Sequence, residues 1–183
     1  MMAMEEGLLS MNNSEKIVLV DLDDQIIGSE TKTRVHEEGL LHRAFSIFIL
    51  DDTKMLLQKR SIDKYHSGGL WSNACCSHQR ENELLDEAVH RRMNEELGID
   101  CNLNEAFSFV YRTVFENGLT EYEYDHVFVG EYSGTININY EEASEVKWFE
   151  FKELKKLMQS NPELFSSWFI VAAPKIIRII EEK

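Results

Sequence analysis

The sequence predicts a mixed α/β or α+β fold, a sandwich in which helices cover a β-sheet. Apolar, β-branched and aromatic residues gather in short runs on both sides of one strongly patterned helix, and the chain ends in helical segments. Hydrophobic residues make up 43% of the 183 residues, which suffices for one buried core. We therefore expect a single domain at residues 16–183, preceded by a flexible tail at residues 1–15.

The first half of the chain is predicted as strands followed by a long loop. Residues 16–32 contain a strand, an Asp-Asp turn and a second short strand. Residues 44–50 and 54–60 are strand-like runs joined by "DDT", which predicts a hairpin. Residues 61–82 show no regular pattern, so we expect them to be mostly loop.

The strongest helix prediction covers residues 83–97, where apolar residues recur at helical spacing and Gly98 can end the helix. The apolar stripe consists of Leu84, Leu85, Ala88, Val89 and Met93. Further strands are expected at residues 106–114, 121–132, 135–139 and 145–151, and helices at about residues 151–160 and 165–182.

Composition narrows the class of function. The chain has 33 acidic and 19 basic residues and a formal net charge of −14, which argues against a general nucleic-acid binder. No apolar run reaches the ~18 residues of a membrane span, and the first residues lack the pattern of a signal peptide. We expect a cytoplasmic protein with free thiols. It should have no nucleic-acid or membrane partner and should be a monomer or weak dimer.

The stretch "WSNACCSH", residues 71–78, places two adjacent cysteines beside a histidine. Side chains alternate on an extended backbone, so Cys76 and His78 would face one side and Cys75 the other. Cys75 then suits a small core residue. For Cys76 two interpretations stand, a buried inert thiol and a functional one.

The stretch "EYEYDH" that begins at residue 121 carries three acids with alternating spacing. Glu121, Glu123 and Asp125 would share one strand face, where they repel each other unless a cation lies among them. The alternative is a solvated edge, with the intervening tyrosines in the core.

Three histidines have carboxylate or cysteine neighbours that suit metal binding. His36, His42 and His78, together with carboxylates, are ligands typical of zinc or a first-row transition metal, although their spacing matches no compact zinc finger. The remaining three are expected to be surface or core residues; they are His66, His90 and His126. The basic residues Lys32, Arg60 and Lys64 suit an anionic substrate, or else are exposed ends of strands.

The central helix resembles the Nudix box, G-x5-E-x7-R-E-U-x-E-E-x-G-U, in which U is a bulky apolar residue. The matching frame is Ser77, Glu83, Arg91, Arg92, Met93, Glu95, Glu96, Gly98 and Ile99. Ser77 stands where the box has Gly, and Arg92 stands where Nudix hydrolases have a Glu that gathers Mg²⁺. The resemblance therefore implies a Nudix fold whose hydrolytic metal site has been rebuilt.

Several stretches together resemble the type I isopentenyl-diphosphate Δ-isomerases, which are Nudix-fold enzymes. In family order they are residues 30–46, 56–64, 71–78, 91–98, 121–128, 145–148 and 165–169. At residues 66–69 this chain has "HSGG" where the family usually has a Pro-Gly pair. The resemblance implies a Nudix-type αβα sandwich with a mixed sheet. It also implies interconversion of isopentenyl and dimethylallyl diphosphate through a carbocation, in isoprenoid biosynthesis.

The resemblance implies a role for each matching residue. Cys76 and Glu123 would carry protons on opposite sides of the substrate, with Tyr111 steering a proton near Glu123. Trp168 would face the reacting carbons. The implied diphosphate contacts are Lys32, Arg60, Lys64 and Arg91. The implied ligands of one Mn²⁺ or Zn²⁺ are His36, His42, His78, Glu121 and Glu123. Glu96 would hold a Mg²⁺ that also grips the diphosphate.

Two other functions remain open at this point. A Nudix hydrolase of a nucleoside or other diphosphate would need the Glu that Arg92 replaces. A non-catalytic module that binds a diphosphate would not depend on Cys76.

Overall fold

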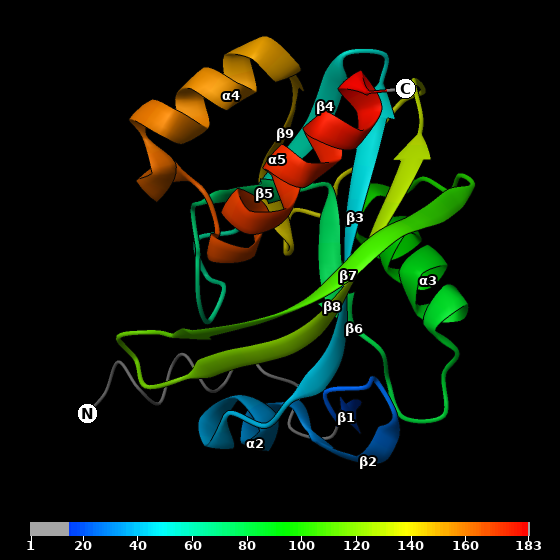
Figure 1. Ribbon diagram of the computed structural model, residues 1–183, viewed down its shortest axis with the longest axis vertical. Helices are drawn as coiled ribbons and strands as arrows, with labels where there is room; N and C mark the ends of the chain where they lie inside the picture. The colour runs from blue at the N-terminus through cyan, green and yellow to red at the C-terminus, as the bar shows by residue number, and fades with distance from the viewer. Residues whose placement is uncertain (1–14, 183) are drawn as a thin grey trace.

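The computed structural model describes residues 15–182 (Figure 1). Its elements are β1 (Lys16–Val20), β2 (Ile26–Thr31), α2 (Lys32–Glu38), β3 (His42–Asp51), β4 (Lys54–Arg60), β5 (Trp71–Asn73), β6 (Cys75–His78), α3 (Leu85–Leu97), β7 (Leu103–Val114), β8 (Thr120–Glu131), β9 (Ala143–Glu150), α4 (Phe151–Ser160), the short 3-10 helix η1 (Pro162–Leu164) and α5 (Ser167–Glu181). The flexible tail predicted at residues 1–15 lies outside the described residues, except for Glu15.

Strand β3 is the centre of a mixed sheet. It pairs in parallel with β8 and antiparallel with β4 and β6, so the predicted hairpin of β3 and β4 is confirmed. Strand β7 pairs antiparallel with β8, and β9 pairs antiparallel with β4. Strands β1 and β2 form an antiparallel hairpin that meets β3 at Leu19 and His42.

Helices cover both faces of the sheet, with α4 and α5 on one side and α3 on the other (Figure 1). Because side chains alternate along a strand, β3 contributes to both layers. Phe48 and Leu50 pack with α4 and α5, whereas Ile47 and Ile49 pack with α3. This arrangement confirms the predicted αβα fold class. None of the helices described in residues 15–182 is long and apolar enough to cross a membrane.

Helix α3 ends at the predicted residue, but it begins at Leu85 and not at residue 83. It ends at Gly98, whose left-handed backbone (φ 62°) lets its N–H bond the Asn94 carbonyl. It begins at Leu85, and the Glu87 carboxylate accepts the backbone N–H of Leu84 at 3.0 Å. Leu84 belongs to the predicted apolar stripe but is exposed, because it precedes the first residue of the helix.

Three local predictions differ from the structure. The seven-residue helix α2 was missed because Val35 is its single aliphatic residue, too little for a detectable period. Residues 61–82, predicted as mostly loop, also contain the short strands β5 and β6. Residues 135–139 form no strand, because the N–H groups of Asn137 and Asn139 bond the carbonyls of Leu97 and Glu96 at the end of α3.

Phe48 provides a test of the layer packing. It is fully buried, with its ring centroid 6.1 Å from that of Phe169 in α5. Phe48→Ala should lower the free energy of unfolding by about 3–5 kcal/mol in urea titrations, because it leaves a cavity between sheet and helix. Leu22→Ala, at an exposed position, should change it by less than about 0.5 kcal/mol. Equal midpoints for the two variants would contradict this packing.

Candidate active site and metal centre

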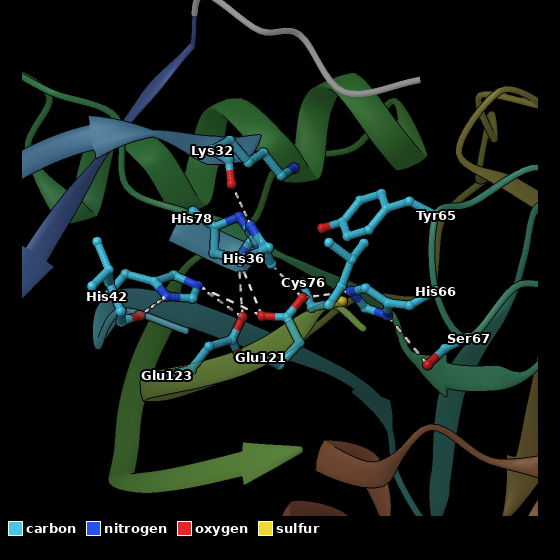
Figure 2. A network of polar contacts seen from close by, with 12 residues as sticks. Lys32, His36, His42, Tyr65, His66, Ser67, Cys76, His78, Glu121 and Glu123 are labelled. Carbon is cyan, nitrogen blue, oxygen red and sulfur yellow. Dashed lines mark hydrogen bonds and ion pairs between the residues drawn. The ribbon is translucent and has the colours of Figure 1, made fainter. Parts of the chain in front are cut away.

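One pocket gathers side chains from the strands β3, β4, β6, β7 and β8 and from the helices α3 and α5. The predicted site residues that line it are Lys32, Arg60, Lys64, Cys76, His78, Glu96, Tyr111, Glu121, Glu123 and Trp168. His36 and His42 lie beside it, in contact with Glu121 (Figure 2). Arg91 does not line it. Its guanidinium pairs with Glu83 and Glu95 and borders a neighbouring cavity.

The histidines and Glu121 form a buried cluster with the geometry of a metal site. The register of β3 with β8 sets His42 opposite Glu123, and β6 adds His78 next to β3. His36 comes from α2, which lies across the end of the sheet. One ligand atom from each of His36, His42, His78 and Glu121 lies within 4.8 Å of the others (Figure 2).

Two of these imidazoles are held by the backbone. Nδ1 of His36 lies 2.6 Å from the Lys32 carbonyl, and Nδ1 of His42 lies 2.9 Å from the Leu40 carbonyl. Since a carbonyl only accepts, each Nδ1 carries a proton, and each Nε2 is directed toward the carboxylates, where it can coordinate a metal ion once it has lost its own proton. Within the part of the chain that the structure describes, these Nε2 atoms and Oε2 of Glu121 are buried without a hydrogen-bond partner. Such a set of converging nitrogen and oxygen donors fits a divalent transition metal or zinc.

Strand β8 buries three carboxylates with different neighbours. Glu121, Glu123 and Asp125 are all buried, so the alternative of a solvated edge is wrong. Burial alone would raise the pKa of Glu121, but the charges of neighbouring imidazoles hold it well below its usual value. Burial and the charge of Glu121 raise the pKa of Glu123 to about 7. Burial raises the pKa of Asp125 well above its usual value, and the Ser46 hydroxyl donates to its carboxyl at 2.8 Å.

The Glu123 carboxyl is held from two sides. Nε2 of His78 lies 2.9 Å from its Oε1, and the Tyr111 hydroxyl donates to its Oε2. Both partners line the pocket with it. The carboxyl therefore has a fixed direction between the histidine cluster and the cavity.

The adjacent cysteines face opposite layers, as the alternation predicts. Cys75 is buried in the core under α3, whereas Cys76 is half-buried and lines the pocket. Burial raises the pKa of Cys76 to about 12, although the nearby Arg60 guanidinium, 3.7 Å from the sulfur, acts in the opposite direction. The thiol of Cys76 is therefore protonated at neutral pH.

The stretch "WSNACCSH" also orients the indole of Trp168. Nε1 of Trp168 donates to Oδ1 of Asn73 at 3.1 Å, and the Asn73 amide donates to the Ile47 carbonyl at 3.2 Å. The Arg60 guanidinium lies 5.2 Å from the indole centroid. Asn73 was not singled out in the sequence, although it belongs to the stretch that carries the cysteines.

The polar end of the pocket holds cations that are paired with acids. Lys64 and Arg92 both pair with Glu142, the Arg92 contact being 3.2 Å. Arg92 also pairs with Glu96 at 2.5 Å, and the Gln58 amide donates to Glu96 at 3.1 Å. Sequence reasoning treated Arg92 only as a departure from the Nudix box, and missed Gln58 and Glu142 altogether.

Sequence reasoning also missed His66. We expected an ordinary surface or core residue, but its ring is buried and its Nε2 lies 2.5 Å from Oε1 of Glu121 (Figure 2). The sequence "HSGG" at residues 66–69, which departs from the usual Pro-Gly pair of the family, was the feature that could have drawn attention to His66. His90 and His126 lie away from the pocket, paired with acids of other segments.

Comparison with known proteins gives consistent matches. Residues 40–169 match the NUDIX domain model. The chain is 48% identical over 156 residues to isopentenyl-diphosphate Delta-isomerase 2 of Photorhabdus laumondii, covering 85% of this chain and 88% of the relative. It is 47% identical over 156 residues to isopentenyl-diphosphate Delta-isomerase of Burkholderia multivorans, with coverages of 85% and 89%.

Solved structures support the fold. DR0079 from Deinococcus radiodurans superposes with a TM-score of 0.72 at 17% identity, covering 91% of this chain and 99% of that one. The MutT protein from Methanosarcina mazei superposes with a TM-score of 0.60 at 19% identity, covering 78% of this chain and 94% of that one.

The histidine cluster makes a direct prediction about metal content. We expect the protein to hold one divalent ion tightly, and His42→Ala and His78→Ala should each lose it, because each removes one donor from the cluster. Elemental analysis after extensive dialysis measures this. His90→Ala, on the outer side of α3, should keep the ion. Full metal content in both His42→Ala and His78→Ala would show that the ion is held elsewhere.

Proposed function

The chain belongs to the Nudix superfamily and, within it, to the isopentenyl-diphosphate Δ-isomerases, and from this premise we propose that the pocket interconverts isopentenyl and dimethylallyl diphosphate. One observation carries the assignment to this pocket: Cys76, Glu123 and Trp168, which come from three distant segments, line the same cavity. A thiol, a carboxyl and an indole are the groups that this proton chemistry needs.

The reaction adds one proton to the terminal alkene carbon and removes another from the methylene carbon that follows the tertiary carbon on the diphosphate side. Between these steps the positive charge resides on the tertiary carbon. An unactivated alkene is a very weak base, so the acid must be held against it where no water competes. A buried pocket with fixed side chains meets this requirement.

Cys76 and Glu123 are the proposed proton carriers. One group must give a proton while another takes one, and the two should differ in protonation. The Cys76 thiol keeps its proton at neutral pH, since burial raises its pKa to about 12. Burial and the charge of Glu121 raise the pKa of Glu123 to about 7, so the two groups differ widely in pKa. Tyr111, which donates to Glu123, holds the carboxyl in place.

Trp168 is proposed to stabilise the cationic intermediate. The negative face of an indole attracts a cation, an interaction worth about 2 kcal/mol when the pair is desolvated. Its side chain is buried and its Nε1 is held by Asn73, so the ring keeps its place. Water would capture the cation as an alcohol, and the helix that carries Trp168 covers this side of the pocket.

We propose that the histidine cluster holds one Mn²⁺ or Zn²⁺. The proposed ligands are His36, His42, His78, Glu121 and Glu123. When bound, the ion would favour the ionised form of the Glu123 carboxyl. Glu96 is the proposed ligand of a Mg²⁺ that enters with the diphosphate, which would relieve the repulsion between an anionic substrate and a protein of net charge −14.

The diphosphate is proposed to lie at the polar end of the pocket, against Lys32, Arg60, Lys64 and Arg92. Arg92 joins the contacts expected from the sequence because it lines the pocket, whereas Arg91 lies in the adjoining cavity. A direct contact of Arg91 with substrate stays a prediction. The cytoplasmic location and the monomeric or weakly dimeric state also stay predictions.

Turnover in D₂O distinguishes this reaction from its alternatives. Isopentenyl diphosphate incubated with the protein should give dimethylallyl diphosphate with deuterium in a methyl group, observed by NMR. Release of phosphate without dimethylallyl diphosphate would instead indicate a hydrolase. Binding without turnover would indicate a non-catalytic module.

Substitution of the proton carriers tests their roles. Cys76→Ala and Glu123→Gln should each lower kcat by about 10²–10⁴-fold or more while the protein stays folded, because each removes a proton carrier. Steady-state kinetics and thermal unfolding measure both effects. Cys101→Ala is the matched control, since this half-buried thiol packs against Met93 outside the pocket. A Cys76→Ala rate close to that of the unsubstituted enzyme would remove the thiol from the mechanism.

A further inference from the structure

His66 contacts the candidate metal centre, yet the proton chemistry described above does not use it. Its Nε2 lies 2.5 Å from Oε1 of Glu121, the same oxygen that lies 3.2 Å from Nε2 of His36. The other oxygen of Glu121, Oε2, lies 3.6 Å from Nε2 of His42. It is buried without a hydrogen-bond partner among the described residues. Oε1 of Glu121 thus lies between His66 and His36, while Oε2 faces His42 and His78.

The ring of His66 cannot turn away from Glu121 without losing its packing. It stacks on Phe115, with ring centroids 4.4 Å apart and an interplanar angle of 7°. Tyr65 meets it edge to face at 4.4 Å and Trp168 at 5.8 Å. Aromatic neighbours on several sides hold an imidazole in one orientation.

The hydrogen-bond partners of His66 fix its tautomer. A carboxylate oxygen only accepts, so Nε2 carries the proton that Glu121 receives. Nδ1 is then free to accept from the Ser67 hydroxyl, 3.3 Å away. Arg60 donates to the backbone carbonyl of His66 at 3.3 Å, which holds the main chain at the same point.

The loop that carries His66 folds back tightly on itself. A Cβ added at Gly68 would lie 2.5 Å from the Ile62 carbonyl oxygen, and Gly69 has φ +77°. Ser67 also has a positive φ of 52°, which is uncommon for a residue with a side chain. The unusual backbone conformation of "HSGG" therefore accompanies a loop that brings the His66 side chain to the buried carboxylate of Glu121.

We propose that His66 is a positioning residue that holds Oε1 of Glu121 and thereby directs Oε2 toward the imidazoles of the metal cluster. The inference rests on the metal centre of the proposed function and adds to it a hydrogen bond outside the ligand set. Carboxylates that bind metals are held by such outer partners, and their loss weakens metal binding or activity by about 10–100-fold.

The test compares two substitutions in the full-length chain. His66→Phe keeps an aromatic ring on Phe115 but removes the N–H group. His66→Gln supplies an amide N–H close to the position of Nε2. Zn²⁺ titration against a chromophoric chelator, and the visible spectrum of Co²⁺-loaded protein, report on the cluster without any turnover.

We expect the Zn²⁺ dissociation constant of His66→Phe to rise by about 10–100-fold and the Co²⁺ spectrum to change, with most of the loss recovered in His66→Gln. At saturating metal, kcat of His66→Phe should fall while KM for isopentenyl diphosphate stays unchanged. His126→Phe is the matched control, a buried histidine paired with Asp24 and Glu105 away from the pocket. Its Zn²⁺ affinity should equal that of the unsubstituted protein.

Three results would overturn the proposal. Unchanged Zn²⁺ affinity in His66→Phe would mean that the hydrogen bond does not matter to the cluster. Complete loss of metal in His66→Phe, as in His42→Ala, would make His66 a ligand. A His66→Gln variant that is folded by circular dichroism but binds Zn²⁺ no better than His66→Phe would exclude the N–H group as the cause. Because Zn²⁺ binding is measured without substrate, absence of isomerase turnover would refute the proposed function separately.

Discussion

Three carboxylates buried on one face of β8 are the constraint on which the rest of this site depends. An uncompensated buried charge costs several kcal/mol, so each acid needs its own arrangement with its neighbours. Neighbouring imidazoles, acting against burial, hold the pKa of Glu121 well below its usual value, whereas burial and the charge of Glu121 raise the pKa of Glu123 to about 7. Burial raises the pKa of Asp125 well above its usual value. One strand thus supplies three acids with different pKa shifts at two-residue spacing.

The sheet places the partners of these acids by strand pairing. Because β3 lies between β8 and β6, residues from both neighbours reach one end of the same cavity. Alternation then sends Cys76 and His78 into the pocket and Cys75 into the layer beneath α3. Cys76 and His78 of the histidine cluster are therefore neighbours in the site because both belong to the four-residue strand β6.

The pocket separates a polar end from an aromatic side. Lys64, Arg92 and Glu142 form an ion network at the polar end, where the anionic diphosphate would bind in spite of the negative net charge. Trp168 and Tyr111 line the pocket elsewhere, where they would exclude water from the proposed cation. Arg60 contacts both Cys76 and Trp168, so the basic residue closest to the thiol also lies against the indole. The proposed diphosphate contacts and the proposed proton carriers therefore line the same cavity.

Local sequence patterns by themselves determined the main strands, helix α3, the shared face of Glu121, Glu123 and Asp125, and the opposite directions of the two cysteines. Those features follow from periods of two and 3.6 residues, which a short stretch of chain contains. The stretches that resemble the isomerase family, taken in their order along the chain, indicated the family and most residues of the candidate site. Tertiary structure alone decided that the acids are buried, that Arg92 and not Arg91 lines the pocket, that residues 135–139 bond the end of α3, and that His66 holds Glu121. Each of these depends on strand register or loop closure between segments far apart in the chain, and no local period encodes that information.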